Sequence, residues 1–227
     1  MKETPPSTSV PLQSAAAPTD SRSSRGNEAH TSQSSEPPHF GCDSSEMASA
    51  GLAKYQEFLA GKTTERIFRH PTCHPSRPTG FCPCDGSLLK VLWFYGKAAA
   101  LLTVLKLPFN APKLALLRRL GARVGRNVFI SADVWIDPAF PELLTIEDDV
   151  MLGVGVKIAL HEFGPDHFSA GRVTLRKGAV IGGFALIGHG VEIGEGAVVA
   201  GGAAVGRDVP PGKLAIGNPA RIMPRIS

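Results

Sequence analysis

Aromatic residues are scarce in this sequence of 227 residues, at 7%, and cysteine occurs only four times. So few cysteines exclude a small scaffold held together by disulfides. No apolar segment follows Met1 as a secretory signal requires, so we expect a cytoplasmic protein. Lysine and arginine do not cluster among aromatic residues, which argues against a nucleic-acid-binding protein. Hydrophobic residues at 43% and charged residues at 19% exclude a chain that is wholly disordered or coiled-coil.

Glycine and positive charge are plentiful, and both are unevenly placed along the chain. Eighteen of the 25 glycines follow Leu120, so the second half of the chain turns often. Residues 1–50 hold three of the 24 lysines and arginines but six of the 20 acidic residues, which leaves a net charge of +7 on the remainder. A basic body of this kind suits an anionic ligand or surface.

Residues 1–50 are of low complexity, because 22 of them are Ser, Thr or Pro and large apolar side chains are nearly missing. Such a segment cannot bury enough surface to offset its ordering entropy, so we expect a disordered tail. Its six acidic residues argue against a transit peptide.

Residues 51–86 are predicted to connect this tail to the folded body. Leu52, Tyr55 and Phe58 recur at helical spacing and predict one short helix. The prolines of residues 70–84 exclude regular structure there. The same stretch contains four residues able to ligate zinc, namely Cys73, His74, Cys82 and Cys84. Their spacing departs from the paired C-x2-C pattern, so we expect free thiols, with a structural metal or a disulfide as the alternatives.

Residues 87–120 are strongly apolar and predict a helical cap. One helix is expected to end before Pro108 and a second to run from about Pro112 to Leu120. A membrane span needs ~20 apolar residues, and three lysines interrupt this run, namely Lys90, Lys97 and Lys106. We expect the cap to pack on the folded body, with peripheral membrane contact through residues 88–107 as the alternative and a true span as the less favoured one.

An aliphatic residue opens each six-residue unit of the C-terminal half, and a small or β-branched residue tends to stand fifth. The units begin at Val124, Ile130, Ile136, Ile146, Leu152, Ile158, Leu175, Ile181, Ile187, Ile193, Val199 and Val205. Each unit is typical of one short strand and one tight corner, so three units close a triangular coil whose aliphatic side chains point inward. Ordinary strands with glycine turns do not predict a fixed period of six. We therefore predict a mainly β domain over residues 121–227, preceded by helices and a disordered tail.

This repeat resembles that of the hexapeptide-repeat acyltransferases over roughly residues 121–226. Residues 141–148 and 208–223 are most similar to the maltose, galactoside and exopolysaccharide O-acetyltransferases within that family. The resemblance implies a left-handed parallel β-helix that transfers an acetyl group from acetyl-CoA to a hydroxyl of a sugar or similar small molecule. It also implies a homotrimer, because the donor groove lies between two prisms, and the chemistry needs no metal.

The repeat breaks between Ile158 and Leu175, where eleven extra residues, 161–171, leave the coils. Loops that interrupt a rigid repeat are where function concentrates. Acyl transfer needs a base that removes the hydroxyl proton, and imidazole titrates in the right range. The resemblance places the catalytic histidine at the start of this loop, which is His161. The alternative is a solvated loop histidine.

Other residues of this region are candidates for supporting roles. His167 and His189 are the alternative bases, although His189 is typical of an exposed corner. Glu162 or Asp166 is predicted to face the substrate and to orient the ring of His161 by accepting its other N–H. A backbone carbonyl would serve equally well.

The resemblance also aligns three corners, Gly183, Gly201 and Gly206, with backbone positions that bind the pantetheine arm of the donor. Arg207 and Arg221 align with cationic positions that would meet the CoA phosphates. Glycines also simply make corners. Gly183 and Gly206 stand where the family often has a hydroxyl residue, which leaves room for a different acyl chain.

Asp133 and Asp137 lie in the early coils, near a polar position that contacts the acceptor in the family. Asp133 is our candidate acceptor contact, with a solvated carboxylate as the alternative. Two other functions stay open, a non-catalytic β-helix scaffold and a γ-type carbonic anhydrase. The latter needs three convergent histidines, and the repeat offers only His161, His167 and His189.

Overall fold

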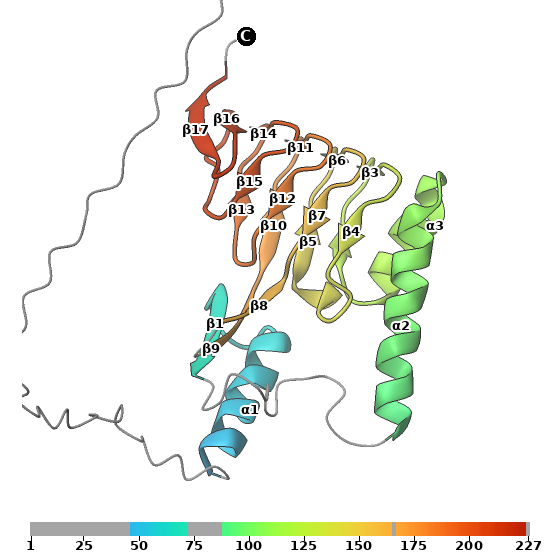
Figure 1. Ribbon diagram of the computed structural model, residues 1–227, viewed down its shortest axis with the longest axis vertical. Helices are drawn as coiled ribbons and strands as arrows, with labels where there is room; N and C mark the ends of the chain where they lie inside the picture. Colours follow the sequence, from blue (N-terminus) through green and yellow to red (C-terminus); the bar gives the residue numbers. More distant parts are fainter. Residues whose placement is uncertain (1–45, 72–87, 165–166, 226–227) are drawn as a thin grey trace, which may run out of the picture. The chain divides into compact units, whose positions relative to one another are not determined.

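The computed structural model describes residues 46–71, 88–164 and 167–225 (Figure 1). These residues belong to one compact unit of the chain, Gly41–Ser227. The expected tail lies outside the described residues except for residues 46–50. The candidate zinc ligands and one loop carboxylate also lie outside them, namely Cys73, His74, Cys82, Cys84 and Asp166.

Short strands and tight corners alternate through the C-terminal half, and each strand passes the chain to the next of three sheets (Figure 1). The first sheet contains β2 (Arg123–Val124), β5 (Leu144–Ile146), β10 (Val173–Leu175) and β13 (Glu192–Ile193). The second contains β3 (Phe129–Ile130), β6 (Met151–Leu152), β11 (Val180–Ile181), β14 (Val198–Val199), β16 (Lys213–Ile216) and β17 (Arg221–Pro224). The third contains β4 (Trp135–Ile136), β7 (Lys157–Ile158), β12 (Leu186–Ile187) and β15 (Ala204–Val205). Neighbouring strands are parallel except β16 and β17, so the chain winds as a parallel β-helix, and the predicted mainly β fold is confirmed.

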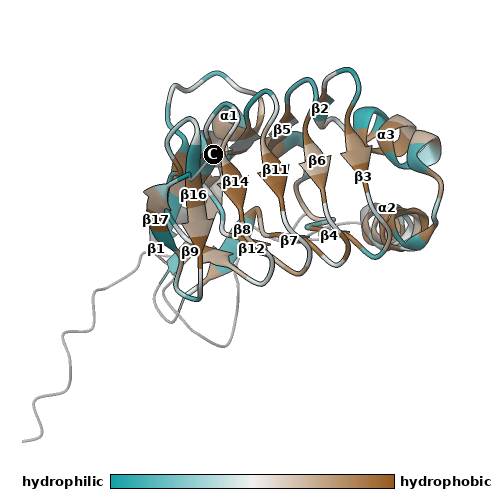
Figure 2. Ribbon diagram, turned by 90° about the horizontal axis from the view of Figure 1, so that it is seen from above, coloured by the Kyte–Doolittle hydropathy of each residue, from teal (hydrophilic) through white to brown (hydrophobic). Residues whose placement is uncertain are grey.

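The core runs along the axis of this β-helix as columns of aliphatic side chains. Ile136, Ile158 and Ile187 occupy paired positions of β4, β7 and β12, and all three are fully buried. The valine or alanine at the fifth position of each unit is buried in the same way, as at Val156 and Ala185. Figure 2 shows the result as hydrophobic strands repeated along the coils. Each coil is therefore stabilised by the coils on either side of it.

Two helices precede the first coil. α2 (Leu88–Lys106) ends two residues before Pro108, and α3 (Asn110–Arg119) begins two residues before Pro112 rather than at it. Proline is tolerated in the first turn because the N–H groups there have no acceptor within the helix. α2 lies against β4, and α3 lies against β2 and β3. Among the described residues, no helix has both the length and the apolar character to cross a membrane.

Polar side chains of α3 pair with the open edge of β3. Asn110 donates its side-chain N–H to the carbonyl of Val128 at 2.8 Å and accepts the N–H of Ile130 at 3.0 Å. The buried Lys113 donates to the carbonyls of Ile130 at 3.0 Å and Ser131 at 2.5 Å, and its burial lowers the pKa of that ammonium. These bonds satisfy an edge that would otherwise accept a further strand.

The opposite end of the β-helix is also closed. β16 adds in parallel to β14, and the chain then turns through Gly217, whose φ of +93° favours glycine. β17 returns antiparallel to β16, so parallel stacking stops there.

The residues that interrupt the repeat form a hairpin of β8 (His161–Phe163) and β9 (His167–Gly171). A strand of the N-terminal connector, β1 (Ile67–Pro71), pairs with β9 and forms the outer edge of this small sheet. Its Ile67 packs against the corner at Gly190, where φ is +72° and a Cβ would collide with that isoleucine. The connector therefore forms part of the loop region instead of only leading to it.

This arrangement corrects two expectations. Proline does not exclude regular structure at residue 70, because β1 includes His70 and Pro71. An edge strand tolerates proline, since the missing N–H is not needed by a second neighbour. The helix of the connector, α1 (Glu46–Leu59), begins five residues inside the segment for which we expect a disordered tail.

Aromatic side chains join the connector to the hairpin and the coils. The Tyr55 ring lies 5.2 Å from that of Phe68, 5.9 Å from Phe140 and 5.8 Å from Phe168. Burial raises the pKa of Tyr55 far above its usual value. A cluster of aromatic rings thus lies around the interruption of the repeat, next to His161.

Candidate active site

His161 is the first residue of β8 and follows the second coil directly. The third strand of that coil ends at Ile158, and the backbone of His161 pairs with Ala170 of β9. Its ring Nδ1 hydrogen-bonds to Oδ2 of Asp137, which follows β4 in the first coil. Both partners therefore stand on rigid elements, so their relative position is fixed.

The Asp137 carboxylate is 1% exposed and has several hydrogen-bond donors around it. Oδ1 accepts the N–H of Ala139 at 2.9 Å, and Oδ2 accepts the N–H of Leu160 at 3.2 Å in addition to the ring. A carboxylate only accepts, so the imidazole must donate its Nδ1–H. The lone pair of the neutral ring then resides on Nε2.

Three phenylalanine rings surround this imidazole. Phe140 and Phe163 lie 5.2 Å and 5.3 Å from it in edge-to-face geometry, and Phe168 lies 6.0 Å away. They restrict the rotation of the ring and exclude water from part of it. The His161 side chain keeps 23% of its surface exposed, which leaves room for a ligand.

The ring partner differs from the one the sequence predicts. Glu162 directs its carboxylate to His189, at 3.5 Å from Nδ1, and Asp137 takes the role expected of Glu162 or Asp166. Because Ile136 pairs with Ile158, Asp137 and His161 both follow paired strands and lie at the same corner of adjacent coils. This neighbourhood follows only from the register between the two coils, so the sequence prediction missed it.

His189 follows β12 in the third coil and is mostly buried, unlike an exposed corner residue. Its Nε2 lies 2.8 Å from the hydroxyl of Ser169, which is fully buried and directly opposite Glu162 in the hairpin. Burial lowers the pKa of His189 below 6.5. Through its contacts with Ser169 and Glu162, His189 links the hairpin to the third coil. His167, the other alternative base, stands on β9.

Gly183 and Gly201 lie on adjacent coils at the corner between the second and third sheets. The N–H of Gly202 donates to the carbonyl of Gly183 at 2.9 Å, and a Cβ on Gly201 would lie 3.2 Å from that same oxygen. Within the described part of the chain, the N–H groups of Gly183 and Gly201 have no hydrogen-bond acceptor. His161 follows the third sheet, at a different corner. A single chain therefore does not bring these glycines to His161.

Gly206, Arg207 and Arg221 share one groove of about 780 Å³ near the C-terminal end of the β-helix. Arg207 follows β15, and Arg221 begins β17. The rest of the lining is uncharged, with Ile216, Asn218 and Pro219 among it. Two guanidinium groups on an otherwise neutral groove suit phosphate oxygens.

Asp133 occupies the corner between β3 and β4 and is exposed, with φ at +57°. This is the corner of Gly183, so the structure does not place Asp133 beside His161. Glu162 is half-exposed in the middle of β8, opposite Ser169. In the described segments, no group of three or more His, Cys, Asp or Glu side chains is placed to hold a metal ion.

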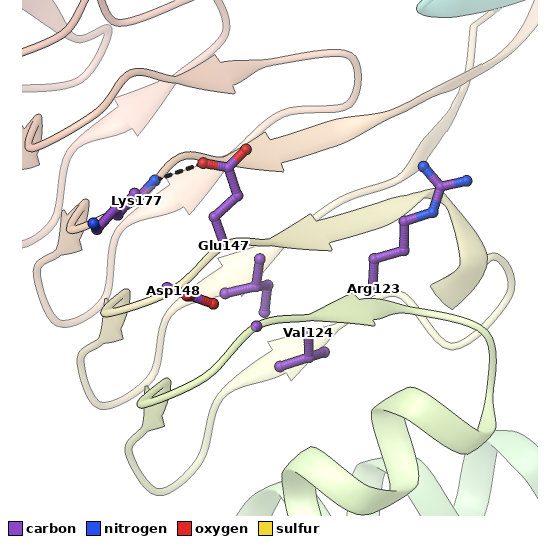
Figure 3. Close-up of a pocket in the computed structure, with 7 residues that line it drawn as sticks. Arg123, Val124, Glu147, Asp148 and Lys177 are labelled. Atoms are coloured by element: carbon purple, nitrogen blue, oxygen red, sulfur yellow. Dashed lines mark hydrogen bonds between the residues drawn. The ribbon is translucent and has the colours of Figure 1, made fainter.

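A second groove, of about 450 Å³, lies at the corner between the first and second sheets (Figure 3). Glu147 accepts the backbone N–H of Lys177 at 2.9 Å and pairs with Arg176 at 2.8 Å. Asp148 pairs with Arg126 at 3.1 Å, and hydrogen bonds from Arg126 lower the pKa of Asp148. The carboxylates here are used to tie one coil to the next, and the groove is at another corner from His161.

The chain is similar to known proteins both in sequence and in fold. No family model matches the sequence. YvoF of Bacillus subtilis (strain 168), assigned as an acetyltransferase, is 32% identical over 117 residues, which are 51% of this chain and 68% of YvoF. A hexapeptide-repeat acetyltransferase of Vibrio cholerae has the same fold, with a TM-score of 0.52 and 23% identity over 63% of this chain and 95% of its own. Its complex with acetyl-CoA gives a TM-score of 0.52 and 25% identity over 63% of this chain and 92% of its own.

Proposed function

The chain belongs to the hexapeptide-repeat acetyltransferases, and from this membership we propose that it transfers an acetyl group from acetyl-CoA to a hydroxyl group, with His161 as the general base. The observation that carries this proposal is the hydrogen bond from His161 Nδ1 to the buried carboxylate of Asp137. It selects the tautomer in which Nε2 accepts a proton. We also take the β-helix to be left-handed, as the resemblance to the family implies.

The reaction proceeds as a direct transfer. Nε2 of His161 removes the proton of the acceptor hydroxyl while its oxygen attacks the thioester carbonyl. The tetrahedral intermediate collapses, the carbon–sulfur bond breaks, and the CoA thiolate takes the proton back from Nε2. Asp137 acts as a positioning residue, because it touches His161 and not the reacting atoms. The unbonded N–H groups of Gly183 and Gly201 are suited to stabilise the developing oxyanion.

These glycines reach a histidine only in an assembly, since a single chain keeps them at another corner. We therefore propose a homotrimer with threefold symmetry, in which one chain supplies His161 and its neighbour supplies Gly183 and Gly201. Its support is the exposed apolar surface of the second and third sheets and the corner between them, which includes Phe129, Met151, Phe184 and Leu186. Such a surface is typical of an interface between subunits.

The donor and acceptor are assigned by charge and position. Arg207 and Arg221 bind the phosphates of acetyl-CoA in the groove that they share with Gly206. The acceptor is a small hydroxyl compound of the sugar type, which enters beside the half-exposed Glu162. Asp133, at the glycine corner, contacts the acceptor only across the subunit interface.

The test is release of CoA thiol from acetyl-CoA across a panel of sugars and alcohols. His161→Ala should lower kcat/KM by roughly 10²–10⁴-fold, since it removes the base. The matched control is His167→Ala, which removes a histidine from the same hairpin. Equal losses in the two variants, or full activity of His161→Ala, would overturn the assignment of the base.

A further inference from the structure

The exposed side of α2 is apolar. At roughly 100° per residue, its exposed residues form one continuous side. They are Leu88, Leu89, Leu92, Trp93, Tyr95, Gly96, Ala99, Ala100, Thr103 and Lys106. Lys106 alone among them is charged, and Leu89 and Trp93 are 77% and 71% exposed. A surface helix ordinarily presents charged residues to solvent, so α2 shows the reverse pattern.

The other side of α2 packs against the rest of the protein. Leu101 and Leu105 are fully buried, and Lys97 donates to the carbonyl of Ala139 at 3.3 Å. Lys97, one of the three lysines that interrupt the apolar run, therefore binds the first coil and does not lie on the exposed side of α2. Figure 2 shows α2 in hydrophobic colours at one end of the coils.

The segment of chain that contains this apolar side is rich in positive charge. Residues 88–132 contain eight lysines and arginines and no aspartate or glutamate. Five of the eight are exposed, namely Lys106, Arg118, Arg119, Arg123 and Arg126, and of these Arg126 pairs with Asp148. We propose that the exposed side of α2 docks onto the surface of an anionic lipid membrane, with the helix lying in the plane of the interface. Tryptophan, tyrosine and leucine beside cationic residues are the composition that such interfacial helices use.

A groove beside this side of α2 fits the same ligand. It measures about 360 Å³ and is lined by Ala99, Leu102, Thr103, Lys106, Leu107 and Pro108. Five uncharged residues and one ammonium suit an acyl chain beneath an anionic headgroup. Two other occupants of the exposed side of α2, a second copy of this chain and residues 1–50 of the same chain, fit less well than a membrane. A second copy of this chain would place the same cations opposite each other, and residues 1–50 offer few large apolar side chains to cover the helix.

Flotation of the full chain with lipid vesicles tests the proposal. Vesicles of phosphatidylcholine with about 30% phosphatidylserine should bind the protein at least ~5-fold better than phosphatidylcholine alone, and salt should weaken the binding. Leu92→Asp should reduce binding by about tenfold or more, because it places a carboxylate on the docking side. The matched control is Leu52→Asp, an exposed leucine of α1, which should bind as the parent does.

A fluorescence measurement reports on the docking side directly. The chain has two tryptophans, so Trp135→Phe leaves Trp93 as the single reporter, and its emission should shift to the blue with phosphatidylserine vesicles. No binding, equal binding to neutral vesicles, or unchanged binding by Leu92→Asp would overturn the proposal. A smaller oligomer of Leu92→Asp without lipid would assign this side to a second copy instead. The proposal does not rest on acetyl transfer, since donor binding is measured separately.

Discussion

Replacing Asp137 with asparagine keeps the size of the side chain but adds a donor where the structure requires an acceptor. The carboxylate accepts from the ring of His161 and from the N–H groups of Ala139 and Leu160. An amide has one oxygen, so at least one of these donors must face an NH2 group. If the NH2 faces the ring, the imidazole proton moves to Nε2, and Nε2 can no longer accept a proton.

The size of the effect follows from this change of tautomer. In the Ser-His-Asp triad of serine proteases, the same exchange of aspartate for asparagine lowers turnover by about 10⁴-fold. In the other orientation of the amide, the oxygen still faces His161 and the NH2 group faces the N–H of Ala139. A fraction of the molecules then keeps the correct tautomer of His161. We expect kcat/KM to fall by roughly 10²–10⁴-fold. Losing one hydrogen bond to a buried charged group should cost about 1.5–3 kcal/mol of unfolding free energy.

The assay is thiol release as a function of pH, with urea denaturation to check folding and calorimetry to check donor binding. The matched control is Glu195→Gln, the same exchange of a carboxylate for an amide at an exposed position outside the proposed site, whose catalytic rate and stability should change little. A folded Asp137→Asn protein with nearly normal activity would refute the assigned tautomer. A loss of acetyl-CoA binding in that variant would also refute it, because Asp137 is not placed in the donor groove.

Three further predictions concern binding, protonation and stability. Substituting both Arg207 and Arg221 by alanine should raise the Kd for acetyl-CoA by roughly tenfold or more, and calorimetry with acetyl-pantetheine, which lacks the nucleotide phosphates, should show no such change. His189 should titrate by NMR below 6.5, because burial disfavours its charged form. The unfolded histidine then binds protons more readily, so the unfolding free energy should fall as the pH drops below 6.5, and His189→Asn should weaken that dependence. Lys113→Ala leaves two coil carbonyls without their donor and should lower the unfolding free energy by about 2 kcal/mol, whereas an unchanged urea midpoint would contradict the role given to α3.

The coils were predictable because their signal is local and repeated. The inward residue of each unit, such as Ile136 or Ile158, meets the same position one coil away. A period of six therefore reports both the strand and its neighbour. The position of His161 at the break was predictable for the same reason, since the break is visible against a regular repeat.

The supporting parts of the site were not predictable from local pattern. β1 pairs with β9, which lies about a hundred residues further along the chain, and an edge strand of this kind has no periodic signal. Asp137 can be placed next to His161 only when the unequal spacing between the repeat units of the first two coils is known. Hydropathy shows that α2 is apolar, but only the packing of Leu101 and Leu105 shows which side is covered.

Titration of acetyl-CoA into the parent protein and into His161→Ala tests the central claim most directly. We predict micromolar binding that both proteins share, because the donor groove carries Arg207 and Arg221 and the base lies elsewhere. Binding in both, with activity only in the parent, would establish His161 as a catalytic residue and not a ligand contact. No binding of acetyl-CoA or of longer acyl-CoAs by the parent would contradict the enzyme assignment and favour a β-helix that serves as a scaffold.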